Sequence, residues 1–478
     1  MSAPRTAGRP ATTVGPKPRS GRTTEGLLLL VAIGVGVAGY IAAGLGYDGE
    51  VPADIVVVAA GSAVLFLIAH LVVRRYATYA DPVLLPSIAF LNMFGLVLIH
   101  RLDLVAHDAA IEAGRTPPSA DAVSQLVWTM LGVALFVAVL VVIRDHRMLQ
   151  RFTYTALLAG IALLLLPLLP VVGTSINGAR LWLRFGGLSF QPGEAAKLCF
   201  ILFFAGYLVA KRDVLALART RVMGVDLPRG RDLGPLLLAW GASMAVLVFE
   251  RDLGSALLFF GLFVAMLYIA TGRRSWLILG AVLFGAGAYV AYQLFAHVQT
   301  RIDVWLDPFG QASGGGYQIV QSLYGLASGG LLGTGLGAGN PELVPFAKTD
   351  FILAAAGEEL GLAGLVALLM VYAVVVQRGL RIAVTARDPY GTLLAAGLSI
   401  TLALQLFVVV GGVTKLIPLT GLTTPFLSYG GSSLIANWVL IALLLRISDA
   451  GRRPAPAPAP ALDDAPTQVV PLVPGGGA

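Results

Sequence analysis

The chain has 478 residues, of which 57% are hydrophobic and only 12% are charged, and its mean hydropathy is +0.82. Soluble domains carry about a quarter charged residues, so this composition argues against an ordinary soluble protein. The net charge of +7 does not indicate nucleic-acid binding, because the basic residues stand in short clusters between apolar blocks. One cysteine, and five histidines without ligand spacing, argue against a disulfide framework, a zinc site or haem.

Residues 1–24 are polar, Pro-rich and basic, and we expect a disordered cytoplasmic arm rather than a secretory signal. About twelve apolar blocks follow, each long enough to cross a bilayer as a helix. They lie near 26–46, 54–73, 82–100, 122–143, 153–172, 195–210, 233–249, 253–271, 276–296, 351–376, 391–413 and 431–446. This pattern predicts an all-α polytopic membrane protein of about 12 transmembrane helices, with its membrane domain over 25–448. The Pro- and Gly-rich tail, 449–478, is predicted to be disordered and cytoplasmic.

Lys and Arg are concentrated in every second connection between these blocks. Arg74-Arg75, Arg144 and Arg273-Arg274 are examples, and the intervening connections carry few basic residues. With an even number of spans, the basic connections share a side with both termini. The positive-inside rule assigns that side to the cytoplasm.

The connection between the ninth and tenth blocks is unusually long. It covers residues 297–350 and is predicted to be a large external loop before the tenth helix. Loops of this length are more often functional than idle, and the many glycines let the backbone turn tightly or approach a ligand. The segment also gathers polar residues that would suit a binding site: Asp303, Asp307, Tyr317, Gln318, Gln321, Ser322, Lys348, Thr349 and Asp350.

Several motifs in this loop and beside it occur in the same order as in a known family. They are GARLWLRFGGLSFQPGEAAK at 178–197, ERDLG at 250–254, WLDPFG at 305–310, GYQIVQS at 316–322, TDFILAAAGEELG at 349–361 and IPLTGLTTPFLSYGGSS at 417–433. Over about residues 150–447 the chain resembles the shape, elongation, division and sporulation (SEDS) family of RodA- and FtsW-type proteins. The two additional spans near the N-terminus are similar to actinobacterial RodA-type members.

The resemblance implies a function in the bacterial plasma membrane. SEDS proteins are peptidoglycan glycosyltransferases that polymerise the lipid-linked precursor lipid II, and they work with a class B penicillin-binding protein as transpeptidase. We therefore expect a lipid II polymerase of the RodA type, acting in cell elongation and shape. An FtsW-type role in division is the alternative within the family, because the two roles differ by complex rather than by chemistry.

Asp307 matches the family's essential aspartate, and the resemblance implies that it is the catalytic general base. Polymerisation joins the 4-hydroxyl of one lipid II sugar to the anomeric carbon of another with inversion, and a carboxylate near that hydroxyl would accept its proton. The residues alone leave another interpretation open, because an aspartate before a proline is also a common turn opener. Asp303 is the nearby rival for the role of base.

Three more charged residues are candidates for a polar pocket. Glu194 and Lys197 are three positions apart at the start of a helix and therefore share a face. Charges within a span are costly and indicate a cavity. The resemblance implies that these two residues and Asp252 line the cavity below the catalytic aspartate. The alternative is an ion pair that only locks helix packing.

The leaving group would be a pyrophosphate, whose developing charge needs cations or a metal ion. We expect Arg180 and Lys415 to contact it, although snorkelling toward lipid headgroups is an equally simple role for both. Gln318, Ser322 and Thr349 are further candidate substrate-binding residues. The resemblance also implies a divalent cation, Mg²⁺ or Mn²⁺, but the sequence shows no set of metal ligands.

Two functions outside glycosyl transfer are also compatible with a bundle of membrane helices. A lipid II flippase or transporter would need polar residues through the whole depth of the membrane. Here the polar residues crowd the predicted external half, which favours chemistry at that side. A non-catalytic scaffold for the transpeptidase would tolerate Asp307→Asn, whereas an enzyme would not.

Overall fold

The structure is a computed structural model that describes residues 21–169, 172–176, 179–185, 188–216, 220–222, 225–227, 241, 244 and 252–454. In this part of the chain, 11 helical segments are long and apolar enough to cross a membrane. The expected polytopic all-α fold is therefore confirmed. The expected span at 233–249 lies outside the described residues except for Gly241 and Met244, as do residues 1–20 of the predicted arm and 455–478 of the predicted tail.

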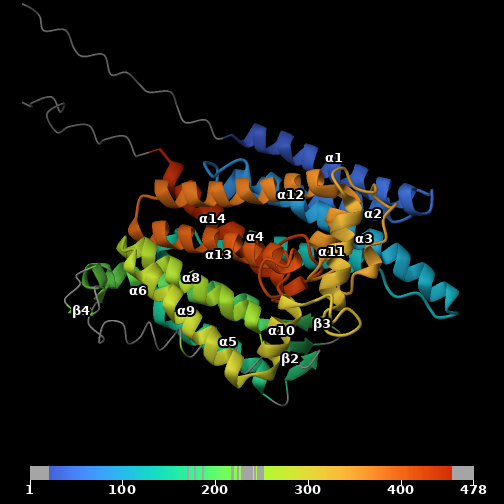
Figure 1. Cartoon of the computed structure of the whole chain (residues 1–478). Coiled ribbons are helices and arrows are strands. Elements are labelled where there is room, and N and C mark those ends of the chain that lie inside the picture. Colours follow the sequence, from blue (N-terminus) through green and yellow to red (C-terminus); the bar gives the residue numbers. More distant parts are fainter. Residues whose placement is uncertain are drawn as a thin grey trace, which may run out of the picture.

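The spans form a bundle of roughly antiparallel helices (Figure 1). Their bounds are α1 (Arg22–Tyr47), α2 (Ile55–Tyr76), α3 (Leu84–Glu112), α4 (Asp121–Val142), η1 (His146–Phe152) continuing into α5 (Thr153–Leu165) and η2 (Leu166–Leu168), α6 (Pro192–Ala216), α8 (Leu253–Thr271), α9 (Ser275–Leu294), α12 (Ile352–Thr385), α13 (Pro389–Val413) and α14 (Gly431–Arg452).

The first and last described helices meet at one end of the bundle. Arg22, at the start of α1, donates to the carbonyl of Ala80, and Asp449, near the end of α14, accepts from the backbone N–H of Tyr79 at 2.9 Å. We call this the termini end; it lies at the left of Figure 1. The opposite end carries α10 (Ala296–Leu306), α11 (Tyr317–Gly329) and η3 (Pro341–Leu343), which form the long connection between α9 and α12, and we call it the loop end.

Short strands also occur, which the sequence interpretation did not include. β1 (Gly173–Ile176), β2 (Ala179–Phe185) and β3 (Leu188–Phe190) form an antiparallel sheet in that order, and β4 (Thr220–Val222) pairs with β5 (Val225–Leu227). The three-stranded sheet precedes α6 at the loop end (Figure 1). Its register sets Thr174 opposite Trp182.

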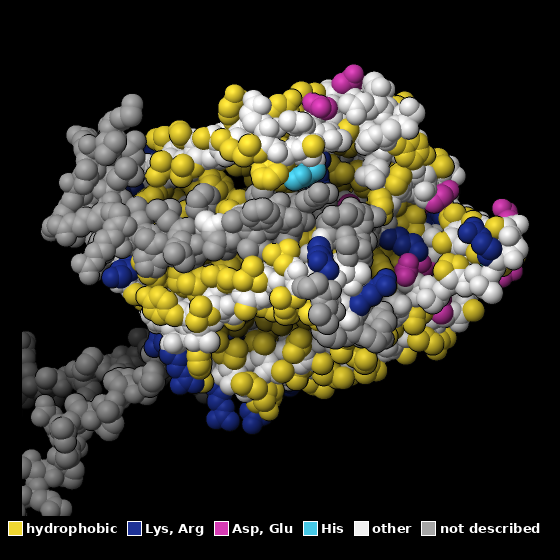
Figure 2. Space-filling model, turned by 90° about the horizontal axis from the view of Figure 1, so that it is seen from below, with side chains coloured by type: hydrophobic (Ala, Val, Ile, Leu, Met, Phe, Trp, Pro, Cys, Tyr) yellow, Lys and Arg dark blue, Asp and Glu magenta, His cyan; other side chains and the backbone are white. Residues whose placement is uncertain are grey.

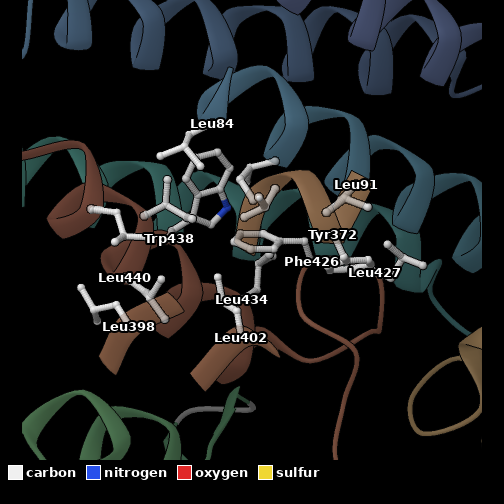
Figure 3. Packing of buried hydrophobic residues seen from close by; sticks show 14 of the residues in the cluster. Leu84, Leu91, Tyr372, Leu398, Leu402, Phe426, Leu427, Leu434, Trp438 and Leu440 are labelled. Carbon is white, nitrogen blue, oxygen red and sulfur yellow. The ribbon is translucent and has the colours of Figure 1, made fainter. Parts of the chain in front are cut away.

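Trp438 of α14 lies at the centre of an apolar core in the middle of the bundle (Figure 3). The indole is fully buried and packs edge-on against the rings of Phe136 and Phe426, with ring centroids 5.5 and 5.9 Å away. Gly132 of α4 allows this approach, because a Cβ there would lie 2.5 Å from the indole Cδ1.

The outward faces of the spans are apolar, as a lipid environment requires. Leu30 of α1 and Val56 of α2 are 68% and 72% exposed. Seen from below, hydrophobic side chains cover much of the flank of the molecule (Figure 2). Some Lys and Arg side chains lie at its left end, which is the termini end, and others lie toward the loop end together with the visible Asp and Glu.

A break in α12 fixes part of the long connection. Gly361 has a φ of 67° and a ψ of −174°, a conformation open essentially to glycine alone. Here the connection pairs with the helix: the N–H of Leu362 donates to the carbonyl of Gly330 at 2.9 Å, and the N–H of Gly335 donates to the carbonyl of Glu359 at 3.0 Å. Segment 330–335 is thereby held against α12.

Candidate active site

Asp307 caps the C-terminal end of α10 at the loop end. Its Oδ1 accepts a hydrogen bond from the backbone N–H of Gly310 at 2.9 Å, so the Asx-type turn expected for an aspartate before proline does form. A Cβ on Gly310 would lie 2.2 Å from Asp307 Oδ2, so glycine leaves room for the second oxygen. The side chain is exposed. The turn therefore orients this carboxylate without burying it, and the two interpretations of Asp307 are compatible.

Two side chains of α10 bind the segment that follows α13. Arg301 Nη1 donates to the carbonyl of Leu419 at 2.9 Å, and the indole N–H of Trp305 donates to the carbonyl of Lys415 at 3.1 Å. These bonds fix the helix that leads into Asp307. Arg301 precedes Asp307 by six positions, which is about 9 Å along a helix axis.

A buried polar cluster is built where α6, α8 and α13 meet. Lys197 Nζ lies 2.8 Å from Glu194 Oε2 and 3.0 Å from Gln405 Oε1. Gln405 in turn donates from Nε2 to the carbonyl of Thr423 at 2.9 Å. All three side chains are buried. Glu194 and Lys197 share a helix face, as expected, and they form an ion pair inside the bundle.

Asp252 joins this cluster at the start of α8. Its Oδ1 accepts from the backbone N–H of Ser255 at 2.9 Å, and its Oδ2 accepts from the Ser255 hydroxyl at 2.6 Å. Burial raises the pKa of Asp252, with a smaller raising effect from Glu194, whereas the Ser255 hydrogen bonds and Arg301 lower it. Asp252 is thus close enough to the Glu194–Lys197 pair for the charge of Glu194 to act on it.

Two further charged residues interact electrostatically with Asp252: Asp350, which is one of the polar residues expected to suit a binding site, and Arg301, which was not among those residues. Burial raises the pKa of Asp350 to about 6, partly offset by Thr349 and Arg301. Burial lowers the pKa of Arg301, opposed by the carboxylates of Asp252 and Asp350. Arg301 is therefore close enough to both acids to be influenced by their charges, and this attraction connects α10 with the polar cluster. Arg301 and Asp350 could have been suspected from the sequence, because both are ionisable residues in the long connection between two spans.

The remaining predicted residues lie on separate elements. Arg180 is partly exposed on β2, and Lys415, with a φ of 61°, is partly exposed in the turn beneath Trp305. Gln318 is partly exposed in the first turn of α11. Ser322 is fully buried and donates to the carbonyl of Val413 at 3.2 Å, so its hydroxyl faces α13 in this structure.

Thr349 and Lys348 lie just before Asp350. The hydroxyl of Thr349 donates to the carbonyl of Phe346 at 3.3 Å. Lys348 Nζ lies 2.5 Å from Asp103 and 2.8 Å from Asp121. The pKa of Lys348 is raised because these two acids outweigh the effect of burial, which is the largest single influence and lowers it. The charge of Lys348 thus fastens the connection to α3 and α4.

The described residues do not offer a protein-only metal site. Among them, no group of three or more His, Cys, Asp or Glu side chains is placed to hold a metal ion. Both carboxylate oxygens of Asp252 accept hydrogen bonds from Ser255. The donor set of these residues therefore does not fit a metal bound by the protein alone.

The fold and these residues define a polytopic membrane protein with an oriented, exposed carboxylate and a buried polar cluster at the same end of the bundle. The family model of the FtsW, RodA and SpoVE cell cycle proteins matches residues 82–453, and the chain belongs to this family.

Three relatives show how far the similarity extends. The chain is 52% identical to the peptidoglycan glycosyltransferase RodA of Mycobacterium tuberculosis over 434 residues, which cover 91% of this chain and 92% of the relative. It is 54% identical to the protein of the same name from Mycobacterium leprae over 391 residues, 82% of each chain. A solved chain of a peptidoglycan synthase complex that coordinates polymerization and crosslinking is 27% identical, with a TM-score of 0.61 over 78% of this chain and 99% of that one.

Proposed function

We propose that this protein is a peptidoglycan glycosyltransferase that polymerises lipid II into glycan strands for cell elongation. Its identity to the mycobacterial RodA proteins extends over most of both chains. The observation that carries the proposal is the placement of Asp307: an exposed carboxylate, oriented by Gly310, at the end of a helix whose Arg301 is attracted electrostatically to the buried Asp252 and to Asp350.

In the proposed reaction, Asp307 acts as general base. The 4-hydroxyl oxygen of one sugar attacks the anomeric carbon of a second lipid II, and the bond from that carbon to the pyrophosphate oxygen breaks. The hydroxyl proton passes to the Asp307 carboxylate, which contributes about 10²–10⁴-fold to the rate. The attack comes from the face opposite the leaving group, so a single displacement inverts the anomeric configuration and needs no covalent intermediate.

The pyrophosphate leaves with its electron pair and its charge. Lys415, in the turn fixed by Trp305, and Arg180, on β2, are the proposed cationic contacts for it. Mg²⁺ is often bound by one or two carboxylates together with substrate phosphates. We accordingly keep Mg²⁺ or Mn²⁺ as a proposed cofactor that would enter with the pyrophosphate.

We also propose that the loop end faces the outside of the plasma membrane and that both termini lie in the cytoplasm. Basic residues cluster at the termini end, among them Arg74 and Arg75 in the last turn of α2 and Arg378, which lies 3.6 Å from Asp81. The positive-inside rule assigns that end to the cytoplasm.

A flippase of the same lipid is the rival function. It would need a polar path through the depth of the bundle. In the described part of the chain, the middle of the bundle is instead filled by the apolar core around Trp438 (Figure 3). The polar cluster lies at the loop end, which supports chemistry at one surface over transport across the membrane.

The test is polymerisation of fluorescent lipid II by the full-length protein in proteoliposomes. It is run with the protein alone and with a co-purified class B penicillin-binding protein, the transpeptidase partner that we propose. Glycan strands on a gel are the expected result, and a chelator followed by Mg²⁺ or Mn²⁺ tests the cofactor. Absence of strands with the partner present, together with lipid II flipping in vesicles, would overturn the proposal in favour of the flippase.

A further inference from the structure

The helices α1 and α2 lie outside the region matched by the family model, which begins at residue 82. They nevertheless pack tightly on the core. The buried face of α1 includes Leu29, Ala32, Gly36, Tyr40 and Ala43, spaced as one helical stripe. A Cβ on Gly36 would lie 2.5 Å from Met93 Cβ of α3. Such close approach through small residues is typical of stable helix pairs in membranes, so the hairpin is part of the bundle rather than a loose anchor.

The end of α1 touches the long connection backbone to backbone. A Cβ on Gly46 would lie 2.0 Å from the carbonyl oxygen of Leu336. On the other side of this contact, a Cβ on Gly337 would lie 2.6 Å from the carbonyl oxygen of Ala43. Gly337 also has a φ of 90°, which favours glycine. The last turn of α1 therefore packs directly against the backbone of residues 336–337.

Arg101 of α3 ties this contact to α12. Its side chain is 2% exposed, and its Nη2 donates to the carbonyl of Gly339 at 2.7 Å while its Nε donates to Glu359 Oε1 at 2.9 Å. The ring of Tyr47, at the end of α1, covers this guanidinium, with 4.5 Å from Cζ to the ring centroid. An aromatic face over a cation shields it from water and stabilises it. Glu358, the neighbour of Glu359, accepts from the backbone N–H of Asn340 at 2.8 Å.

The connection fixed in this way continues to the candidate active site. From Asn340 the chain runs to Lys348, which is paired with Asp103 and Asp121, and then to Asp350, whose charge interacts with that of Arg301 of α10. Displacement of segment 336–340 would therefore loosen the part of the connection that carries Lys348 and Asp350.

We infer that the α1–α2 hairpin positions the long connection for catalysis, and that Tyr47 does so by covering Arg101. Tyr47 is a positioning residue in this account, since it acts through Arg101 and the Gly339 carbonyl. The effect on catalysis rests on the proposed transferase function, whereas the effect on the connection itself does not.

The experiment compares three variants of the full-length protein. Tyr47→Leu removes the aromatic face but keeps an apolar side chain. Tyr47→Phe keeps the ring and loses only the hydroxyl, which is 3.0 Å from Asp108 at the surface. Leu45→Ala is the matched control, because Leu45 is two positions away and 47% exposed. Hydrogen exchange of residues 331–350 and the kcat and KM of lipid II polymerisation are measured for each.

We expect Tyr47→Leu to raise amide exchange in 331–350 above the change in the transmembrane helices and to lower kcat roughly 10- to 100-fold, since misplacement of about 1 Å can cost this much. KM should change less than kcat. Tyr47→Phe and Leu45→Ala should match the wild type.

Unchanged exchange in the connection of Tyr47→Leu would overturn the inference, and so would a uniform rise over the whole bundle. Faster amide exchange in residues 331–350 of Tyr47→Phe than in the wild type would also contradict the inference, because this variant keeps the aromatic ring. If the wild type makes no glycan strands, the transferase proposal fails, but the exchange data still decide whether the hairpin positions the connection.

Discussion

Lys197 of α6 and Gln405 of α13 lie 3.0 Å apart, Nζ to Oε1, although 208 positions separate them in the chain. Lys197 is also paired with Glu194, and Gln405 reaches the Thr423 carbonyl in the segment after α13. One lysine thus joins two transmembrane helices, and through Gln405 it is linked to the segment that supports α10.

Replacing Lys197 by methionine should strongly destabilise the protein. Removal of one partner of a buried ion pair costs about 3–5 kcal/mol, because the remaining charge has no compensation. Here the remaining charge is that of Glu194. Thermal unfolding in detergent should show a large fall in Tm for Lys197→Met.

The double variant Lys197→Met/Glu194→Gln is the matched control. It removes the unpaired charge and should recover much of the lost Tm. Equal losses in the single and double variants would show that the two side chains do not interact as the structure indicates.

The pH dependence of stability should carry a contribution from Asp350. Burial raises its pKa in the folded protein to about 6, from the ordinary value of 3.8. The folded state therefore holds the proton more tightly, so the stabilisation is fully present below about pH 4 and is lost as the pH rises through about 6. The shift corresponds to roughly 3 kcal/mol.

Tm measured from pH 4 to 7 for the wild type and for Asp350→Asn tests this sign. The Tm of the wild type minus that of Asp350→Asn should decrease as the pH rises and then level off. Asp252, whose pKa burial also raises, is present in both proteins, so the comparison isolates Asp350. An advantage that grows with pH would contradict the assignment.

Gly361→Ala should disrupt the junction between α12 and the long connection. Its backbone conformation costs a non-glycine residue about 1–3 kcal/mol. A Cβ there would also lie 2.2 Å from the backbone nitrogen of Gly333, which cannot move without breaking segment 330–335 away from α12. We expect a lower Tm and greater protease cleavage in that segment.

Gly285→Ala in α9 provides the comparison for Gly361→Ala. Nothing lies within 4 Å of a Cβ at Gly285, so alanine there should be neutral or slightly stabilising, by about 0.5–1 kcal/mol. Equal changes in Tm and in protease cleavage for the two variants would contradict the role assigned to the backbone conformation of Gly361.

The sequence was most informative about the spans. Their length and hydropathy are local properties, and all the expected spans that fall in the described residues are helical there. The helix α6 was expected to be short but runs from Pro192 to Ala216, and α12 continues to Thr385 through a glycine break. The β1–β3 sheet was missed, since its strands have only three to seven residues and stand between glycines.

The site was predictable where it depends on local spacing and not where it depends on distant pairing. The ion pair of Glu194 with Lys197 follows from their separation by three positions. Gln405 could not be associated with them, because only the packing of α6 on α13 brings it close. Lys348 was expected among the polar residues of the external loop, but its two acidic partners are more than 200 positions away along the chain.

The most direct test of the account is the polymerisation rate of Asp307→Asn beside that of Asp303→Asn, each reconstituted with the proposed transpeptidase partner. Both side chains are exposed at the end of α10, but only Asp307 matches the family's essential aspartate and accepts the Gly310 hydrogen bond among the contacts described. We predict that Asp307→Asn loses about 10²–10⁴-fold in rate with an unchanged Tm, and that Asp303→Asn stays near the wild type. Strand synthesis by Asp307→Asn at the wild-type rate would contradict the assignment of Asp307 as the catalytic base.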